Sequence, residues 1–233
     1  MTARMTGWIV AIALLGACGC TRNADDSFVA SARSLRPSVV LISMKIPPEH
    51  KRDKYDDGYA TGFVVASGDW GSDIVTAQHA IDGAWDIDVT FANRWRAPAK
   101  VIAADAGLDL ALLRTSRPNL PPVALGSSSD LQSDVGREVG LLGYPIPDEF
   151  ADENLGMATS LNSGRLSSIR KDALEVTLSI VPGESGAPVF IADTAEVVGV
   201  ADSRFDDERS IGFAVPIDDV KKFLHRRDAA HGF

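Results

Sequence analysis

The sequence predicts an all-β protein, built as a sandwich or as a pair of barrels. Apolar runs of strand length recur along the chain, separated by turns rich in glycine, proline, serine and aspartate. Helical periodicity is found in few stretches. Residues 116–122 include three prolines, so we expect this segment to join two lobes.

The chain begins with the pattern of an export signal. Arg4 precedes an apolar run at residues 8–17, which is too short to span a bilayer comfortably and has the proportions of a signal-peptide core. We therefore expect a signal peptide at residues 1–17.

The next residues predict a lipid anchor. Leu15-Gly16-Ala17-Cys18 resembles the lipobox of bacterial lipoproteins, which implies acylation of Cys18 and a polar linker at residues 18–27. An ordinary cleaved signal is the alternative. Gly19, in place of aspartate, favours anchoring in the outer membrane, facing the periplasm. Cys18 and Cys20 are too close together to staple a domain, so we expect no disulfide in the fold.

The charge balance is acidic. The formal net charge is -9, and removing residues 1–17 takes away one basic residue, Arg4, which leaves 22 basic and 32 acidic side chains, or -10. This composition excludes an electrostatic footprint for nucleic acid, so we expect no nucleic-acid partner.

The first lobe is predicted to open with a helix and to continue as strands. Apolar residues at helical spacing predict a helix at residues 27–36, with Asp26 or Ser27 as its N-cap and Pro37 ending it. Residues 47–58 are expected to form a charged loop. The strands are predicted at 39–44, 61–66, 73–76, 87–91 and 96–103, with a further apolar run at 108–113.

The second lobe repeats the pattern. An amphipathic stretch at residues 218–227 predicts a closing helix packed on this lobe. The strands are predicted at 138–142, 163–167, 173–178, 189–191, 197–201 and 212–215.

A candidate nucleophile lies in the turn Gly183-Glu184-Ser185-Gly186. Gly183 lets the backbone N–H groups of Gly183 and Ser185 turn toward one point, where they would stabilise an oxyanion. A serine hydroxyl also needs an imidazole to take its proton. The alternative is an ordinary hairpin turn, and Ala187 departs from the nucleophile-elbow pattern of α/β-hydrolases.

His79 is the candidate base. It directly follows an apolar strand, whereas the other three histidines lie in a charged loop, a basic helix and the tail. The alternative is a structural histidine that caps a strand end.

Asp109 is the candidate carboxylate that orients His79. It lies inside an apolar run, where a buried carboxylate requires a hydrogen-bond donor such as an imidazole N–H. The alternative is a carboxylate bonded to the amides of its own turn, and Asp105 is the rival candidate for the role.

The order His79, Asp109, Ser185 is that of the chymotrypsin-type triad. Around these residues the chain resembles the protease domain of the HtrA (DegP-like) trypsin-like serine peptidases, in ordered segments over about residues 28–225. The matching segments include Thr61-Gly62-Phe63-Val64-Val65, Val75-Thr76-Ala77-Gln78-His79-Ala80, Asp109-Leu110-Ala111-Leu112-Leu113, Gly143-Tyr144-Pro145, Pro182-Gly183-Glu184-Ser185-Gly186 and Gly212-Phe213-Ala214-Val215-Pro216.

This resemblance implies two six-stranded antiparallel β-barrels, at residues 28–117 and 118–216, with the active site in the cleft between them and a helix and tail at 217–233. It also implies that the substrate pocket is lined by residues just before the oxyanion turn and at one strand end. These pocket residues are Ser179, Ile180, Val200, Ala201, Asp202 and Ser203. Because Ser179 is not an acid, we expect cleavage after small or medium apolar side chains.

Three departures from the family pattern stand out. Glu184 replaces asparagine or aspartate, so we expect a changed pH dependence or substrate preference. Ala187 replaces glycine, so we expect a slightly displaced oxyanion turn. The chain also leaves no room after its closing helix for a PDZ domain, so we expect no peptide-gated activation through one.

Together these features predict a membrane-tethered serine endopeptidase of the cell envelope, with a role in protein quality control. It would act on polypeptides through an acyl-enzyme, without a cofactor or a metal ion. The alternative is a catalytically silent lipoprotein of the same fold that binds peptides or envelope proteins.

Overall fold

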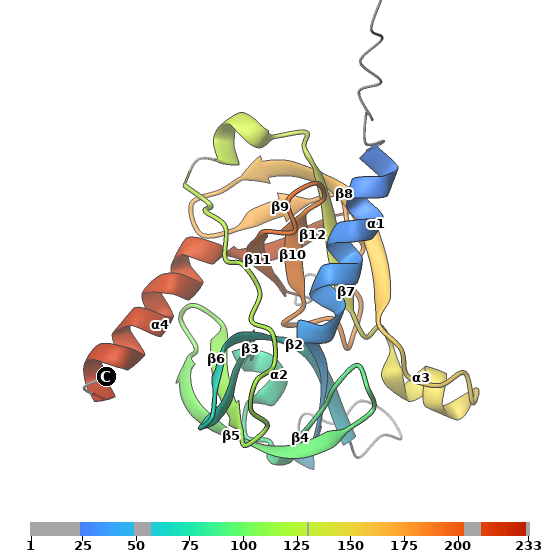
Figure 1. Cartoon of the computed structure of the whole chain (residues 1–233), viewed down its shortest axis with the longest axis vertical. Coiled ribbons are helices and arrows are strands. Elements are labelled where there is room, and N and C mark those ends of the chain that lie inside the picture. Colours follow the sequence, from blue (N-terminus) through green and yellow to red (C-terminus); the bar gives the residue numbers. More distant parts are fainter. Residues whose placement is uncertain (1–23, 49–56, 130, 203–210, 232–233) are drawn as a thin grey trace, which may run out of the picture.

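The computed structural model describes residues 24–48, 57–129, 131–202 and 211–231. They form two closed antiparallel barrels of six strands each, one above the other in Figure 1. This confirms the predicted all-β fold class. The predicted signal peptide and the predicted acylation site, Cys18, lie outside the described residues.

The first barrel has the strand order β1-β2-β3-β6-β5-β4. Its core is made of aliphatic side chains that point inward from every strand, among them Ile42, Val64, Ile74 and Leu113. The strands are β1 Val39–Lys45, β2 Asp57–Gly68, β3 Gly71–Ala77, β4 Trp85–Thr90, β5 Arg96–Asp105 and β6 Leu110–Thr115.

The second barrel has the order β10-β11-β12-β9-β8-β7 and its own apolar core, which includes Leu141, Leu166 and Val189. The strands are β7 Glu138–Gly143, β8 Ser160–Ile169, β9 Leu174–Val176, β10 Pro188–Ile191, β11 Val197–Asp202 and β12 Gly212–Pro216. As expected, residues 117–124, which join the barrels, form neither helix nor strand.

A third apolar cluster joins the two barrels. Phe63 and Leu112 of the first barrel share it with Phe190 and Val200 of the second, all fully buried. Helix α1 (Ala24–Leu35) packs here too, with the Phe28 ring stacked on Phe190 at a centroid distance of 5.9 Å. Because both barrels bury side chains in one cluster, their facing surfaces are held together by hydrophobic packing.

The helices differ in part from the predictions. Helix α1 begins at Ala24, so Asp26 and Ser27 lie inside it and the predicted N-cap is wrong. The sequence patterns also missed α3 (Pro147–Asp152), a short helix with proline at its start and two acidic residues in its first turn.

The closing helix α4 (Ile217–His231) is longer than predicted and contacts both barrels (Figure 1). At its start, Asp218 Oδ2 accepts hydrogen bonds from the backbone N–H groups of Ser128 and Ser129. Near its end, Arg226 pairs with Asp105 of the first barrel. The prediction that this helix packs on the second lobe is therefore correct but incomplete.

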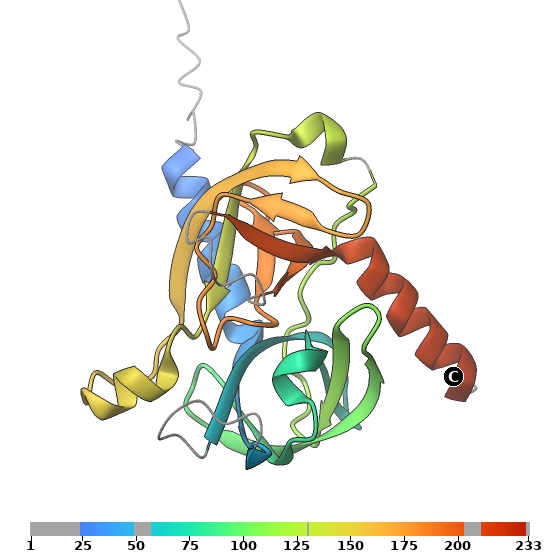
Figure 2. The ribbon, with the colours of Figure 1, turned by 180° about the vertical axis from the view of Figure 1, so that it is seen from behind.

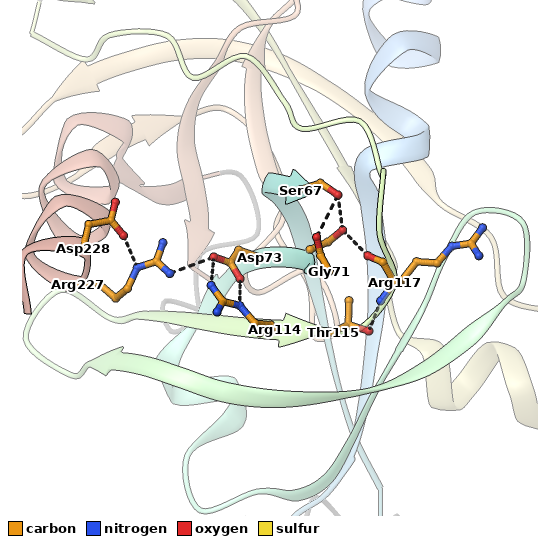
Figure 3. Close-up of polar contacts among 9 residues, drawn as sticks. Ser67, Gly71, Asp73, Arg114, Thr115, Arg117, Arg227 and Asp228 are labelled. Atoms are coloured by element: carbon orange, nitrogen blue, oxygen red, sulfur yellow. Dashed lines mark hydrogen bonds and ion pairs between the residues drawn. The ribbon is translucent and has the colours of Figure 1, made fainter. Parts of the chain in front are cut away.

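A buried ion-pair network fixes the far end of α4 (Figure 3). The Asp73 side chain on β3 is 1% exposed and accepts two hydrogen bonds from Arg114, at 2.7 and 2.9 Å. Arg227 of α4 donates to the same carboxylate at 3.1 Å and pairs with Asp228 at 2.7 Å. The last turns of the helix are thereby tied to the wall of the first barrel.

Within the described residues, no helix is both long enough and apolar enough to cross a membrane.

Candidate active site

Strand pairing brings His79 and Asp109 together. Strands β3 and β6 pair antiparallel, with Ala77 opposite Leu110. Gln78, which follows β3, therefore lies opposite Asp109, which precedes β6. The Gln78 N–H accordingly donates to the Asp109 carbonyl at 3.2 Å. His79 follows on the short helix α2 (Gln78–Ile81), which Figure 2 shows in the foreground on the first barrel.

The Asp109 carboxylate binds His79 through both of its oxygens. Oδ1 accepts the His79 backbone N–H at 2.8 Å, and Oδ2 lies 2.8 Å from the His79 ring Nδ1. The Asp109 side chain is 3% exposed, and its backbone adopts a left-handed conformation with φ of 55°. The carboxylate therefore fixes the imidazole with hydrogen on Nδ1, which leaves Nε2 as a proton acceptor.

Asp105, the rival candidate, makes different contacts. Its Oδ1 accepts the backbone N–H groups of Gly107 and Leu108, and its Oδ2 pairs with Arg226. Asp105 thus bonds to the amides of its own turn and to Arg226, whereas Asp109 bonds to His79.

Ser185, on the second barrel, contacts the other ring nitrogen of His79. Its Oγ lies 3.1 Å from His79 Nε2, although the two residues are 106 positions apart in the chain. The structure thus brings Asp109, His79 and Ser185 into one hydrogen-bonded series across the interface of the barrels. In this arrangement a hydroxyl proton can pass to a ring whose other nitrogen is held by a buried acid.

The turn that carries Ser185 depends on two glycines with positive φ. Gly183 has φ of 93°, and a Cβ placed on it would lie 2.4 Å from the Tyr144 carbonyl oxygen. Gly186 has φ of 87°, and its Cβ would lie 2.2 Å from the Thr61 carbonyl oxygen. Both the conformation and the close packing therefore require glycine at these positions.

Thr61 is a functional residue that the sequence analysis did not single out. This fully buried residue of β2 donates its N–H to the Ser185 carbonyl at 3.0 Å and its hydroxyl to the Gly183 carbonyl at 2.7 Å. Its hydroxyl also accepts the Tyr144 N–H at 3.0 Å. Thr61 thus fixes the serine turn of the second barrel to the first barrel.

The departures at Glu184 and Ala187 are accommodated by a nearby glycine. A Cβ on Gly143 would lie 3.2 Å from both the Ala187 Cβ and the Glu184 Cγ. Because glycine has no side chain at this position of β7, there is room for the Ala187 methyl group and for the Glu184 side chain. The Ala187 N–H still bonds to the Glu184 carbonyl at 2.9 Å.

Glu184 is a buried acid directly beside the nucleophile. The residue is 3% exposed, and its Oε2 accepts the Val181 N–H at 3.0 Å. Burial raises the pKa of the Glu184 carboxyl to about 7, against an ordinary value of 4.5, although the hydrogen bond from Val181 favours the charged form.

Glu184→Gln is expected to remove a pH-dependent loss of stability. Since the folded-state pKa lies above the unfolded one, the stability that protonated Glu184 contributes is fully present below pH 4.5 and is lost as the pH rises through about 7. The loss should reach about 3 kcal/mol. Urea unfolding at pH 5 and pH 8 spans most of this loss, so the variant should lose about 2 to 3 kcal/mol less than the wild type between the two pH values. Equal losses would contradict the prediction.

The predicted pocket residues lie in several environments. The Ser179 carbonyl accepts a hydrogen bond from Asn162 Nδ2 at 2.9 Å, and Ile180 packs against the core of the second barrel. Val200 and Ala201 are buried on β11, in the shared cluster and in the second core respectively. Asp202 ends β11, and Ser203 lies outside the described residues.

Among the described residues, one set of side chains has the spacing of metal ligands. It consists of His79, Asp109 and Asp202, each with one ligand atom within 4.8 Å of the others. Both ring nitrogens of His79 already face Asp109 and Ser185, so the observed arrangement suits proton transfer better than metal coordination.

Comparisons with known proteins agree with this geometry. The family model described as "Trypsin-like peptidase domain" matches residues 60–200. A protein of Halomonas elongata named "Probable periplasmic serine endoprotease DegP-like" is 30% identical over 189 residues, which are 75% of this chain and 36% of the relative. "Serine protease Do-like HtrA" of Bacillus subtilis is 29% identical over 180 residues, covering 71% of this chain and 38% of the relative.

A solved structure shares the fold. The serine endoprotease from Yersinia pestis matches with a TM-score of 0.68 and 24% identity, over 86% of this chain and 66% of that one. The chain spans just over a third of the length of the two curated relatives.

Proposed function

This chain belongs to the trypsin-like peptidase family, and from that premise we propose that it is a serine endopeptidase of the bacterial cell envelope that cleaves polypeptides through an acyl-enzyme. One observation carries the proposal. The Asp109 carboxylate, the His79 ring and the Ser185 hydroxyl form a continuous series of contacts at 2.8 and 3.1 Å.

Each residue of the series has a distinct role in the proposed mechanism. Ser185 Oγ attacks the scissile carbonyl carbon while its proton moves to His79 Nε2. Asp109 keeps the ring oriented and stabilises the imidazolium that forms. His79 then returns the proton to the leaving amine, and a water molecule releases the acyl group from Ser185 by the same steps.

The oxyanion is assigned to the backbone of the serine turn. The N–H groups of Gly183 and Ser185 would stabilise the negative charge that develops on the carbonyl oxygen. The Ile146 N–H donates to the Pro182 carbonyl at 2.7 Å. This bond supports the assignment, because the Pro182 carbonyl and the Gly183 N–H belong to one planar trans peptide unit, so it fixes the direction of that N–H.

The substrates are proposed to be polypeptides with small or apolar side chains before the cleaved bond. Ser179, Ile180 and the end of β11 would line the pocket, as the family resemblance implies. The envelope location rests on the lipobox at Cys18 and on relatives whose names call them periplasmic.

Labelling with a fluorophosphonate probe tests the proposal without knowledge of the substrate. Only a serine whose proton is removed by a base reacts quickly, so the full chain should be labelled at Ser185, and His79→Ala should lower the labelling rate by at least about a thousandfold. Mass spectrometry of the labelled peptide identifies the site. A wild-type protein that is folded and unlabelled across pH 5 to 10 would favour the catalytically silent, peptide-binding alternative.

A further inference from the structure

The pairing of β2 with β3 ends before the two strands reach the active site. Its last pair on this side is Phe63 with Val75, and the antiparallel register would next place Thr61 opposite Ala77. Thr61 remains paired with Leu41 of β1, on its other side. The edge of Thr61 that faces β3 is therefore open to other partners.

The serine turn of the second barrel lies against both of the parted strands. On the β2 side, the Ser185 carbonyl accepts the Thr61 N–H at 3.0 Å. On the β3 side, a Cβ placed on Gly186 would lie 2.3 Å from Thr76 Oγ1, so the turn packs directly against this hydroxyl. His79 follows Thr76 by three residues, so the fit of the turn at this point bears on the distance between Ser185 and His79.

The Thr76 hydroxyl bridges the two strands where their pairing has ended. Thr76 is fully buried, and its Oγ1 donates to the Thr61 carbonyl at 2.8 Å. Thr61 in turn donates its own hydroxyl to the Gly183 carbonyl at 2.7 Å. A continuous series of bonds therefore runs from β3, through Thr61, to the turn that carries Ser185.

The loss of this hydroxyl would displace Thr61. A methyl carbon in its place lies about 3.3 to 3.6 Å from a carbonyl oxygen, so the 2.8 Å contact would lengthen by about half an ångström or more. The Thr61 carbonyl would also lose a hydrogen bond in a fully buried position, which favours a shift toward another donor. The bonds from Thr61 to Ser185 and Gly183 would move with it.

We propose that Thr76 is a positioning residue of the catalytic series, whose hydroxyl fixes the spacing between the strand that leads to His79 and the turn that carries Ser185. The inference rests on the proposed peptidase function. Hydrophobic packing holds the barrels together, but it is non-directional, whereas a hydrogen bond has a preferred length and angle. Thr76 acts through Thr61 and Gly186, and it thereby maintains the 3.1 Å contact between Ser185 Oγ and His79 Nε2.

The test is the rate constant of fluorophosphonate labelling at Ser185 in the full chain. Thr76→Val removes the hydroxyl but keeps the branched shape, and it should lower the rate constant by about ten- to a hundredfold, as expected for a misplacement of up to about 1 Å. The folded molecules should still all be labelled at completion. Thr76→Ser keeps the hydroxyl, so its rate constant should stay within about threefold of the wild type.

Thr115→Val is the matched control. Thr115 is a threonine of β6 in the same barrel, 1% exposed, and its Oγ1 accepts the Arg117 N–H at 3.5 Å. This substitution also removes a buried hydroxyl, but it should leave the labelling rate constant within about twofold of the wild type. A general loss of stability lowers the fraction of folded molecules, whereas a positioning role lowers the rate constant of the molecules that are folded.

Thermal unfolding of each variant checks that it is folded at the labelling temperature. If Thr76→Val is not, Thr76→Ala replaces it, with Thr115→Ala as its control. Labelling of the hydroxyl-free variant at the wild-type rate, or of Thr76→Ser as slowly as that variant, would overturn the inference and leave the proposed function intact. A folded wild type that is unlabelled across pH 5 to 10 would instead remove the proposed function, and this inference with it.

Discussion

Ser185→Ala is expected to lower kcat/KM for an unfolded protein substrate by at least about four orders of magnitude. The substitution removes the attacking oxygen, and the residual rate would come from the oxyanion donors and substrate binding alone. The midpoint of thermal unfolding should stay almost unchanged, because the lost side-chain hydroxyl makes a 3.1 Å contact with His79 and the turn keeps its backbone bonds to Thr61.

Ser167→Ala is a suitable control for this loss. Ser167 is a partly buried serine on β8 whose hydroxyl hydrogen-bonds Glu175. Its replacement should leave turnover within about twofold, as expected for a substitution outside the site. If Ser185→Ala keeps a tenth of the wild-type rate, the assignment of the nucleophile is wrong.

Asp73→Ala is expected to destabilise the fold by about 3 to 5 kcal/mol. The substitution removes the carboxylate that Arg114 and Arg227 share (Figure 3). Arg227, whose side chain is 12% exposed, then lacks this partner. Removing one partner of a buried ion pair costs up to about this much, since Asp228, whose side chain is 42% exposed, compensates the Arg227 charge only in part. Chemical unfolding followed by tryptophan fluorescence measures the change.

The control for Asp73 is an exposed ion pair on the same barrel. Arg96 pairs with Asp88 at 2.8 Å, and the Arg96 side chain is 60% exposed, so Asp88→Ala should cost less than about 1 kcal/mol. If Asp73→Ala costs no more than Asp88→Ala, the network does not anchor helix α4.

The general architecture could be predicted because it depends on local patterns. Apolar runs separated by turn residues predicted strands and an all-β fold, and the family resemblance implied the pair of barrels. The choice between Asp105 and Asp109 depended instead on strand register. The pairing of Ala77 with Leu110 places Asp109 beside His79, whereas the apolar residues around Asp109 favoured it over Asp105 without identifying its partner.

Other features required contacts between residues far apart in the sequence. Thr61 and Gly183 are separated by 122 positions, and nothing near Thr61 indicates that its hydroxyl holds the serine turn. The family resemblance assigned Asp202 to the substrate pocket, but only the folded chain reveals how close its carboxylate lies to Asp109. Helix α3 was missed because six residues are too few for a helical pattern to emerge.

The bonds of Thr61 have a consequence for damaged molecules. The reacting serine belongs to one barrel and its base to the other, and Thr61 joins them at the point of reaction. A slight sliding of one barrel against the other would therefore misalign the serine while every strand is still intact. In the proposed peptidase, loss of activity would therefore precede loss of the fold.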